Sequence, residues 1–448
     1  MRRLKILGAA AAYIAVLLWA YAAIISPAFA YYGYNLNWPD PYEMIWLVTL
    51  SLLPIAFLPL TLSRPSVLIV WWMYLTVYIP SILMPALSLT LGPAKLLSLQ
   101  LALLACMAIL TAAGSARVLV IPGLKLSPLA FWPAVVLLWG SCLVFVCVHF
   151  RISTLIANLA SLFIGGSEYT IRSGFFEQLT QAGRVLGYAT GQTGEALDPF
   201  LIAYGLVYGR KRLLIAGILG QLLIFAVLGS KSILFSTLFL VVVCGLLRFY
   251  KRSFGLALTL ALITVTLLSA FVDRMSDGIF LSSITTRRTL LDPGLLTGFY
   301  FEHYSQTAHA GLGYHFGQEG KAVPAPSYEI GLVYFGDEHV DANANLWAQG
   351  FADFGIPGIF GFTLLLALII WLYNSVAARR NPELAIVLLA MQAFSFSNSA
   401  PLTTVITHGG LASALLLWCA PSPEEEICTD DVASFGGFAT TDAILVNS

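Results

Sequence analysis

Charged side chains are scarce in this chain of 448 residues. Asp, Glu, Lys and Arg together make up only 10% of the positions, whereas a soluble domain carries about a quarter. Hydrophobic residues reach 58%, the mean hydropathy is +0.84, and the formal net charge is zero. This composition excludes a soluble globular domain, and the missing positive charge argues against a nucleic-acid partner.

Metal and nucleotide motifs are missing as well. The six cysteines form no Cys-x-x-Cys pair and none lies in a segment expected outside the membrane, so neither a disulfide framework nor a zinc site is indicated. The histidines form no His-x-x-x-His or Glu-x-x-His pair. Gly229-Ser-Lys-Ser232 lacks the upstream glycine and the Gly-Lys pair of a phosphate-binding loop. We therefore expect no metal, no nucleotide and no other cofactor.

Long apolar windows are what the sequence has instead. Windows of about twenty residues are typical of membrane-spanning helices. We find about twelve of them, at 6–26, 43–62, 67–87, 95–114, 129–149, 185–208, 213–229, 233–249, 254–272, 353–374, 384–399 and 402–420. The sequence thus predicts an all-α polytopic integral membrane protein with about 12 transmembrane helices and two functional external loops.

The distribution of lysine and arginine predicts the orientation. The first apolar run is too long for a cleaved signal peptide, so we expect an uncleaved first span with the N-terminus inside. Of the 23 Lys and Arg residues, 14 then fall in short inner segments and only nine in the longer outer ones, as the positive-inside rule requires. These inner segments are 1–5, 63–66, 115–127, 209–212, 248–252 and 375–383.

The expected organisation alternates helical blocks with external loops. Its segments are helices one to five (1–149), a first external loop (150–184), helices six to nine (185–272), a large external loop (273–350), helices ten to twelve (351–420) and a cytoplasmic, disordered tail (421–448). The tail is rich in Glu and Asp and then in Gly and Thr, a composition typical of a solvated end.

The large external loop concentrates the polar chemistry of the chain. Its 78 residues hold four of the six histidines, 13 of the 46 charged residues and eleven aromatic residues. Such aromatic side chains suit stacking against sugar rings, although an aromatic belt at the membrane interface explains them equally well. His303, His309, His339 and Asp341 are candidates for a general base.

Several external or membrane-embedded charges could bind an anion. Arg172 and Arg287 each precede a glycine by eleven positions, and Arg288 follows directly. Guanidinium groups suit phosphate or pyrophosphate because their planar fork makes two contacts; the alternative is that they reach toward lipid headgroups. Lys231, between two apolar runs, either faces a wet cavity or lies in a tight external turn.

Two carboxylates in the sixth apolar window could support these cations. Glu195 and Asp198 are three positions apart and so share one helix face. A carboxylate within a membrane needs a cationic or hydrogen-bonding partner. We expect Glu195 and Asp198 to hold an arginine in place or to act in catalysis.

The stretch Asp341-Ala-Asn-Ala-Asn-Leu-Trp-Ala-Gln-Gly-Phe-Ala-Asp-Phe-Gly-Ile-Pro-Gly358 resembles the bacterial O-antigen (oligosaccharide repeat-unit) polymerases and the related O-antigen ligases. Those families carry an Asn-x-x-Leu…Gly-x-x-Gly run where the large external loop re-enters the membrane. The chain length, the span number, the two loops and the Arg-x10-Gly spacing are also similar. Where the ligases have Ser-Arg and His-Asn, this chain has Ser230-Lys231 and Ala344-Asn345.

The resemblance implies a glycosyltransferase that joins polyprenyl-pyrophosphate-linked glycans at the outer face of the bacterial inner membrane, with both termini cytoplasmic. It implies donor and acceptor glycans, membrane lipids, a chain-length-regulating copolymerase and a flippase as partners. We expect catalytic residues among Asp341, His339 and His303, and substrate-binding residues among Arg172, Lys231, Arg287, Arg288 and Asn345. The alternatives are an O-antigen ligase-type transferase, a lipid-linked oligosaccharide flippase or other transporter, and a scaffold for polysaccharide export.

Overall fold

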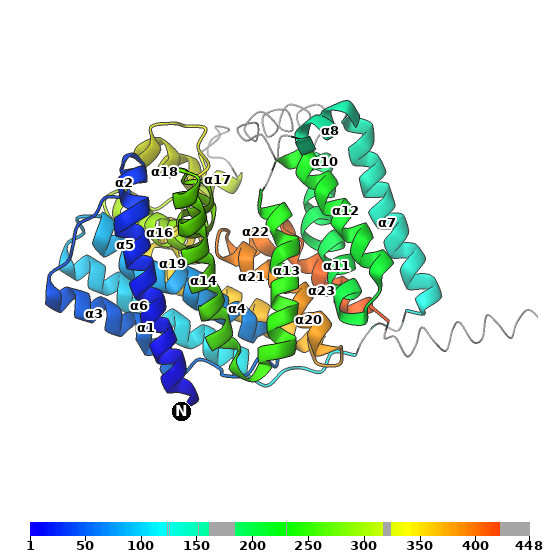
Figure 1. Ribbon diagram of the computed structural model, residues 1–448, viewed down its shortest axis with the longest axis horizontal. Helices are drawn as coiled ribbons and strands as arrows, with labels where there is room; N and C mark the ends of the chain where they lie inside the picture. Colours follow the sequence, from blue (N-terminus) through cyan, green and yellow to red (C-terminus); the bar gives the residue numbers. More distant parts are fainter. Residues whose placement is uncertain are drawn as a thin grey trace, which may run out of the picture. The chain divides into compact units, whose positions relative to one another are not determined.

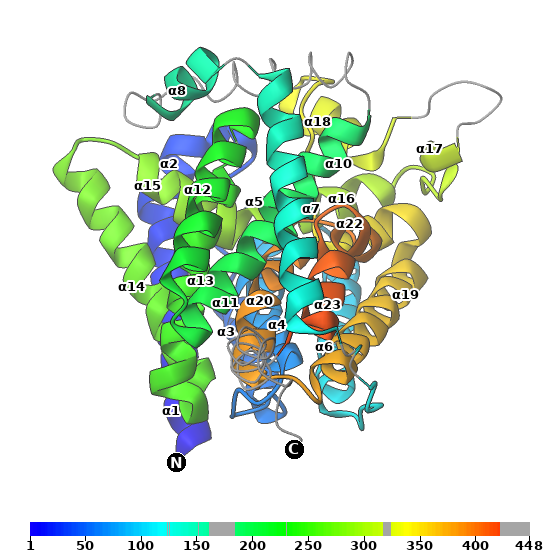
Figure 2. The ribbon, with the colours of Figure 1, turned by 90° about the vertical axis from the view of Figure 1, so that its right-hand side faces the viewer.

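The computed structural model describes residues 1–122, 124, 126–150, 152–160, 184–229, 231–316 and 324–421. Every secondary-structure element within these ranges is helical (Figures 1 and 2), which confirms the all-α class expected from the sequence. The chain divides into two compact units. The first comprises Met1–Leu119, Phe239–Ser375 and Leu389–Gly410, and the second comprises Val120–Leu238, Val376–Leu388 and Leu411–Ser448.

The first unit contains most of the helices. Its α-helices are α1 (Arg2–Ala20), α2 (Ser26–Phe29), α3 (Pro41–Leu52), α4 (Pro65–Met73), α5 (Ile79–Ser88), α6 (Pro93–Ser115), α14 (Phe254–Met275), α15 (Phe280–Ser282), α16 (Asp292–Tyr304), α17 (Gly313–Phe316), α18 (Pro326–Phe335), α19 (Leu346–Ala377), α21 (Ala390–Phe396) and α22 (Pro401–Ile406). The π-helices η1 (Tyr21–Ile25), η4 (Tyr74–Tyr78) and η7 (Ser283–Leu291) and the 3-10 helices η2 (Ala30–Tyr32), η3 (Leu53–Ala56) and η6 (Lys251–Ser253) join or extend them.

The second unit is smaller. Its helices are α7 (Pro128–His149), α8 (Ile152–Ala160), α10 (Arg184–Gln192), the π-helix η5 (Thr193–Leu197), α11 (Asp198–Tyr208), α12 (Lys211–Leu228), α20 (Pro382–Leu388) and α23 (Gly410–Cys419). Helix α13 (Lys231–Tyr250) begins in this unit and ends in the first.

Seven helical segments of the described residues are long and apolar enough to cross a membrane. They are Arg2–Tyr32, Pro65–Ser88, Pro93–Ser115, Pro128–His149, Lys211–Leu228, Phe235–Met275 and Leu346–Ala377. The protein is therefore a polytopic helical membrane protein. The other expected spans fold as helices that are shorter, such as Pro41–Ala56 and Gly410–Cys419, or that carry more polar residues, as in 184–208.

Proline and side-chain caps determine where many of these helices begin. Pro41, Pro65 and Pro93 each occupy the first helical position, where the missing N–H is not needed and the fixed φ suits a helix. At α3 the Asp40 carboxylate also accepts bonds from the backbone N–H of Tyr42 at 2.8 Å and of Glu43 at 2.9 Å. These local signals account for boundaries that agree with the apolar windows.

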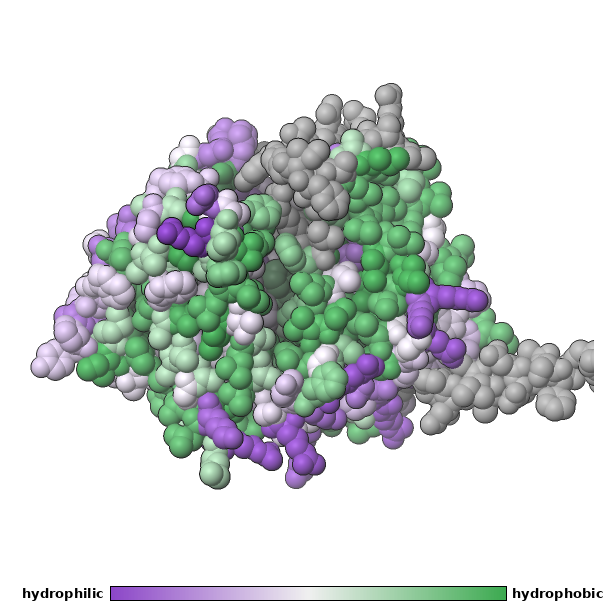
Figure 3. Space-filling model, in the orientation of Figure 1, coloured by the Kyte–Doolittle hydropathy of each residue, from purple (hydrophilic) through white to green (hydrophobic). Residues whose placement is uncertain are grey.

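Of the segments expected inside, 63–66 contacts 115–127 through Arg64, whereas 1–5 contacts the expected second span through Arg3. Arg3 Nη1 donates to the Ile55 carbonyl at 2.5 Å, and Arg64 Nη1 donates to the Ala116 carbonyl at 2.9 Å. Figure 3 shows mostly hydrophobic side chains over α1 and α14, with hydrophilic residues gathered near the N-terminus. Along α14, residues such as Leu268 and Phe271 are 56% and 62% exposed, as suits a surface that faces lipid.

The described residues of the segment 273–350 are folded rather than irregular. It forms α15, η7, α16, α17 and α18 and the first turn of α19. At its start, the Asp273 carboxylate accepts bonds from the backbone N–H of Leu281 at 3.0 Å and of Ser282 at 2.6 Å. The polar residues that set this segment apart in the sequence are thus partly used to build it.

Candidate functional site

Helix α16 is the central element of the candidate site, and glycines seat it against α5. A Cβ at Gly294 would collide with the backbone of Pro80, and a Cβ at Gly298 would lie 2.8 Å from Leu89 Cδ1. Ser81 Oγ also donates to Thr297 Oγ1 at 3.1 Å. The glycine of the Arg287-x10-Gly298 spacing therefore has a packing role, because only glycine lets α16 approach α5 this closely.

Arg287 lies beside the start of α16 and is largely enclosed. Its Nη1 is 3.8 Å from Asp292 Oδ2, its Nε donates to Ser283 Oγ at 3.2 Å, and its side chain is 16% exposed. The guanidinium carbon lies 4.5 Å from the centre of the Phe29 ring, a cation–π contact. Tyr34 donates its hydroxyl proton to the other oxygen of Asp292.

Arg288 has a different environment from its neighbour. Its side chain is exposed and makes no ion pair or hydrogen bond with any residue that the structure describes. Of the two adjacent arginines, Arg288 is thus the one whose guanidinium is open to an anion in this structure.

Asn345 is buried at the start of α19. Its Oδ1 accepts the backbone N–H of Trp347 at 3.0 Å, which caps the helix. Its Nδ2 donates to the Pro293 carbonyl at 2.9 Å and to Thr297 Oγ1 at 2.8 Å. The side chain that we expected to bind substrate thus ties α19 to α16, and it is 0% exposed.

The remainder of the Asp341–Gly358 stretch forms a kink in α19. Phe354 and Gly355 depart from helical geometry, and Gly355 has φ +67°. Pro357 has no N–H, so the Asp353 carbonyl loses its helical partner. The backbone N–H groups of Gly311 (3.1 Å, to Asp353) and Ala310 (2.9 Å, to Ala352) bind the freed carbonyls instead. The motif therefore joins α19 to the 309–311 segment.

The other end of α16 carries a histidine held by a carboxylate. His303 Nε2 lies 2.9 Å from Glu329 Oε1, and the Tyr304 hydroxyl donates to Glu329 Oε2 at 2.8 Å. Burial, and after it the bond to Glu329, raises the pKa of Tyr304, so the phenol keeps its proton and remains a donor. Glu329 comes from α18, and the pairing cannot be read from sequence spacing because 26 residues separate it from His303.

A second polar group lies at the kink of α19. Gln349 Nε2 donates to the Tyr314 hydroxyl at 3.0 Å and to Asp353 Oδ1 at 3.2 Å, and Asp353 is 1% exposed. The exposed His309 approaches the same kink, because a Cβ on Gly355 would lie 2.9 Å from His309 Nε2.

The two other candidate bases lie on the surface. The His339 side chain is 86% exposed, its Nε2 lies 3.9 Å from Glu338 Oε1, and its backbone N–H donates to Asp337 Oδ1 at 2.8 Å. Asp341 is exposed and accepts a hydrogen bond from Asn343 Nδ2 at 2.5 Å. Among the described residues, no group of three or more His, Cys, Asp or Glu side chains is arranged to hold a metal ion.

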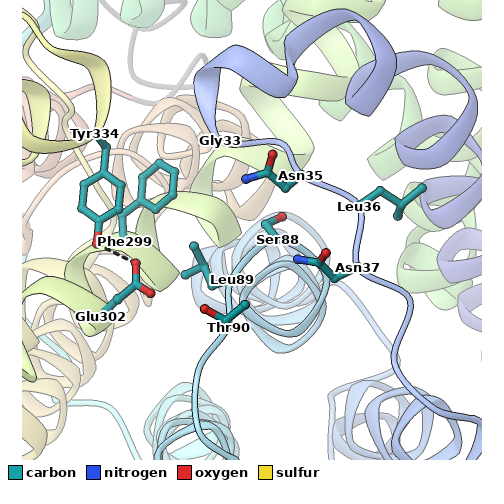
Figure 4. Close-up of a pocket in the computed structure, with 10 residues that line it drawn as sticks. All are labelled: Gly33, Asn35, Leu36, Asn37, Ser88, Leu89, Thr90, Phe299, Glu302 and Tyr334. Carbon is teal, nitrogen blue, oxygen red and sulfur yellow. Dashed lines mark hydrogen bonds between the residues drawn. The ribbon is translucent and has the colours of Figure 1, made fainter.

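Next to α16 lies a pocket that the sequence reasoning missed. It encloses about 560 Å³, and its lining includes Asn35, Asn37, Ser88, Phe299, Glu302 and Tyr334. Figure 4 shows Phe299 and Tyr334 together on one wall, with the bond from Tyr334 to Glu302 drawn. The signal that could have found it is the run Tyr31-Tyr-Gly-Tyr-Asn-Leu-Asn37, which is dense in aromatic and amide side chains.

The remaining candidates belong to the second unit. Asp198 is buried in α11 and accepts a bond from Trp139 Nε1 at 2.7 Å, whereas its Oδ2 has no hydrogen-bond partner among the described residues. Glu195 is half-buried in η5. Lys231 begins α13, and Arg172 lies outside the described residues.

Comparisons with known proteins find no relative for this chain. No protein-family model, no curated protein and no solved structure matches it. The fold and the composition therefore define only the class of this protein. It is a polytopic helical membrane protein with a polar, helical segment between two of its apolar helices.

Proposed function

We propose that this protein is a membrane glycosyltransferase that polymerises polyprenyl-pyrophosphate-linked oligosaccharide repeat units into O-antigen or a similar surface polysaccharide. In this proposal about twelve transmembrane segments carry the chain through the bacterial inner membrane, with both termini cytoplasmic and the site external. The observation that carries it is the pairing of His303 on α16 with Glu329 of α18. The Asp341–Gly358 stretch packs on the same helix α16 through Asn345.

His303 is the base in the proposed reaction. A carboxylate only accepts hydrogen bonds, so Nε2 of a neutral His303 carries the proton shared with Glu329, and Nδ1 keeps a lone pair. That lone pair takes the proton of the acceptor hydroxyl while the hydroxyl oxygen bonds to the anomeric carbon of the donor. The bond from that carbon to the pyrophosphate oxygen breaks, and the pyrophosphate leaves with the electron pair. The donor bond supplies the energy, so the step needs no cofactor.

Cations would stabilise the charge that develops on the leaving pyrophosphate. Arg287 is largely enclosed, because Asp292, Ser283 and the Phe29 ring surround its guanidinium. We therefore assign Arg287 to orienting the start of α16. The contacts to pyrophosphate fall to the exposed Arg288.

Reconstitution tests this function. The purified protein, in liposomes with a panel of undecaprenyl-pyrophosphate-linked trisaccharides, should yield a ladder of longer lipid-linked glycans on gels and by mass spectrometry. The variant H303A should lose the ladder and keep the fold. A full ladder from H303A would overturn the assignment of the base. Single-unit transfer to lipid A, with no ladder, would instead indicate a ligase-type transferase.

A lipid-linked glycan flippase is the second candidate, and Asp198 favours it. Among the described residues one carboxylate oxygen of the buried Asp198 has no hydrogen-bond partner, and it lies at the junction of the π-helix η5 and α11. Such a group is typical of the ionisable sites on which carriers depend. The same liposomes separate the two candidates. A flippase would move the fluorescently labelled lipid-linked glycan across the bilayer without lengthening it, and D198N would stop that movement.

A further inference from the structure

The pocket beside α16 has the chemistry of a sugar-binding site. Asn35 and Asn37 supply amides that both donate and accept, Thr90 and Ser88 supply hydroxyls, and Glu302 supplies a strong acceptor. Sugar hydroxyl groups need this mixture because each can donate and accept at once. The exposed side chains of Asn35, Asn37 and Thr90 leave these groups open to a ligand.

An aromatic wall complements the polar groups. The rings of Phe299 and Tyr334 stack with centres 4.1 Å apart and planes 15° from parallel. Phe299 is 1% exposed, whereas Tyr334 is only partly buried. Phe299 thus supports a Tyr334 ring that can contact the apolar face of a pyranose.

The pocket is held in shape before any ligand enters. The Tyr21 hydroxyl bonds to the Asn35 carbonyl and, at 2.8 Å, to Ser88 Oγ. The Asn37 backbone N–H donates to the Leu87 carbonyl at 2.8 Å. These bonds tie the 33–37 segment to the end of α5, so the amides need no large rearrangement to bind.

The charge of the lining distinguishes neutral from acidic sugars. Glu302 is the one charged residue of the lining described here, and the lining contains no Lys, Arg or His. Its Oε2 accepts the Tyr334 hydroxyl at 2.8 Å. A carboxylate without a neighbouring cation repels an acidic sugar and binds the hydroxyls of a neutral one.

We propose that this pocket binds one uncharged sugar residue of the glycan, and that Glu302 excludes acidic sugars such as uronic acids. This inference rests on the proposed function, and it adds to it the class of repeat unit that the enzyme accepts. Glu302 and His303 of α16 bond to Tyr334 and Glu329 of the same neighbouring helix, α18, so the pocket and the proposed base lie on one pair of helices.

Saturation-transfer NMR on the full-length protein in detergent tests the inference without requiring any transfer reaction. The probes are the methyl glycosides of glucose, galactose, mannose and N-acetylglucosamine, and methyl glucuronide as the acidic counterpart of methyl glucoside. The wild-type protein should bind at least one neutral glycoside and should bind it more tightly than the glucuronide. If no neutral glycoside shows a saturation-transfer signal, or if the glucuronide binds as tightly as the glucoside, the proposal is overturned.

Variants identify the pocket as the source of the signal. Replacing Glu302 by Gln keeps the shape and removes the charge, so the preference for glucoside over glucuronide should fall by roughly tenfold. Asn37→Ala should weaken binding of the neutral glycoside by roughly fivefold. Thr61→Ala, at an exposed position outside the lining, is the matched control and should change neither. Unchanged preference in E302Q would also overturn the proposal.

The glycan ladder separates the two hypotheses. If E302Q loses its sugar preference while H303A binds glycosides normally and makes no ladder, both hypotheses stand. If the wild type makes a ladder but binds no glycoside, only the pocket assignment fails. If glycosides bind with the expected preference and no ladder forms, the transfer reaction fails and the pocket remains.

Discussion

The Nε2 atom of His303 lies 2.9 Å from Oε1 of Glu329, although α16 and α18 bring them from positions 26 residues apart. A carboxylate in this position orients the imidazole and stabilises its protonated form. We expect H303A to reduce polymerisation by roughly 10²- to 10⁴-fold, the usual contribution of a general base. E329Q should reduce it less, because an amide oxygen can still accept the Nε2 proton. Initial rates of glycan elongation in liposomes measure both.

His339 provides the matched control for this prediction. Its side chain is 86% exposed, and its imidazole Nε2 is 3.9 Å from Glu338 Oε1, so H339A should elongate glycan at the wild-type rate. If H339A lost tenfold in elongation rate while H303A kept full activity, the catalytic base would have to be assigned to the 337–341 segment instead.

Substitutions at the two adjacent arginines should affect different properties, the stability of the fold at Arg287 and the binding of the lipid pyrophosphate at Arg288. R287A removes the cation–π contact to Phe29 and the partner of Asp292, and we expect a loss of about 1–2 kcal/mol of stability. R288A should leave the melting temperature unchanged and weaken binding of undecaprenyl pyrophosphate. Thermal unfolding in detergent and lipid binding by native mass spectrometry provide the two measurements. Equal melting losses in both variants would contradict this division of roles.

The kink in α19 should depend on particular glycines. A Cβ at Gly350 would lie 2.5 Å from the Gly358 carbonyl oxygen, and the three nearest atoms all belong to the backbone, which cannot easily move aside. G350A should therefore cost about 1–3 kcal/mol and should lower activity, because the kink joins α19 to the 309–311 segment.

Gly361 of the same helix is the control for the kink. A Cβ there would meet nothing within 4 Å, so G361A should be neutral or stabilise by up to about 1 kcal/mol. Melting curves of the two variants test the pair, and similar stability in G350A and wild type would refute the packing role of Gly350.

The two asparagines of the Asp341–Gly358 stretch should differ sharply in their effect on stability. Asn345 caps α19 and donates two bonds to α16, so N345A should cost about 2–4 kcal/mol from the lost cap and the unpaired groups. N345D keeps the acceptor that caps the helix, but it places a buried carboxylate oxygen against the Pro293 carbonyl, so it should cost at least as much as N345A. N343A, at an exposed position, should melt like the wild type. If N345A instead melts normally and loses only glycan binding, Asn345 is a substrate ligand.

Substitutions at and near Asp198 test whether the second unit takes part in the reaction. Its Oδ2 has no partner among the described residues, and a Cβ at Gly220 would collide with the carboxylate. D198N keeps the acceptor for Trp139 and removes the buried charge, so it should leave stability unchanged or raise it, whereas G220A should lower it. Glycan elongation should survive D198N. Loss of elongation in a stable D198N variant would show that the carboxylate acts in the reaction or holds an essential cation.

Much of the helical framework could be predicted from the sequence, because a helix in a membrane satisfies its own backbone bonds and needs only a long apolar stretch. Each of the twelve apolar windows overlaps a helix of the structure. The number of spans was less accessible. Pro54 breaks the second window into a short helix, and Leu389 separates α20 from α21, so apolar length alone did not give the length of the helix.

The candidate site was only partly predictable. His303 and Arg287 stood out as polar residues in an apolar chain, but Glu329, Glu302 and Tyr334 gained meaning only from their neighbours. Asn345 was singled out by resemblance, and the structure gives it a buried, fully bonded position.

The sequence by itself therefore determined that this protein lies in a membrane, because charge is scarce and long apolar windows recur. It also indicated that the remaining polar residues gather in the segments that face water. Only the tertiary structure decided which of those residues meet. Side-chain pairing depends on the packing of α16 against α5 at Gly294 and Gly298 and on the kink at Gly355. Such contacts join residues far apart in the chain, and no local pattern records them.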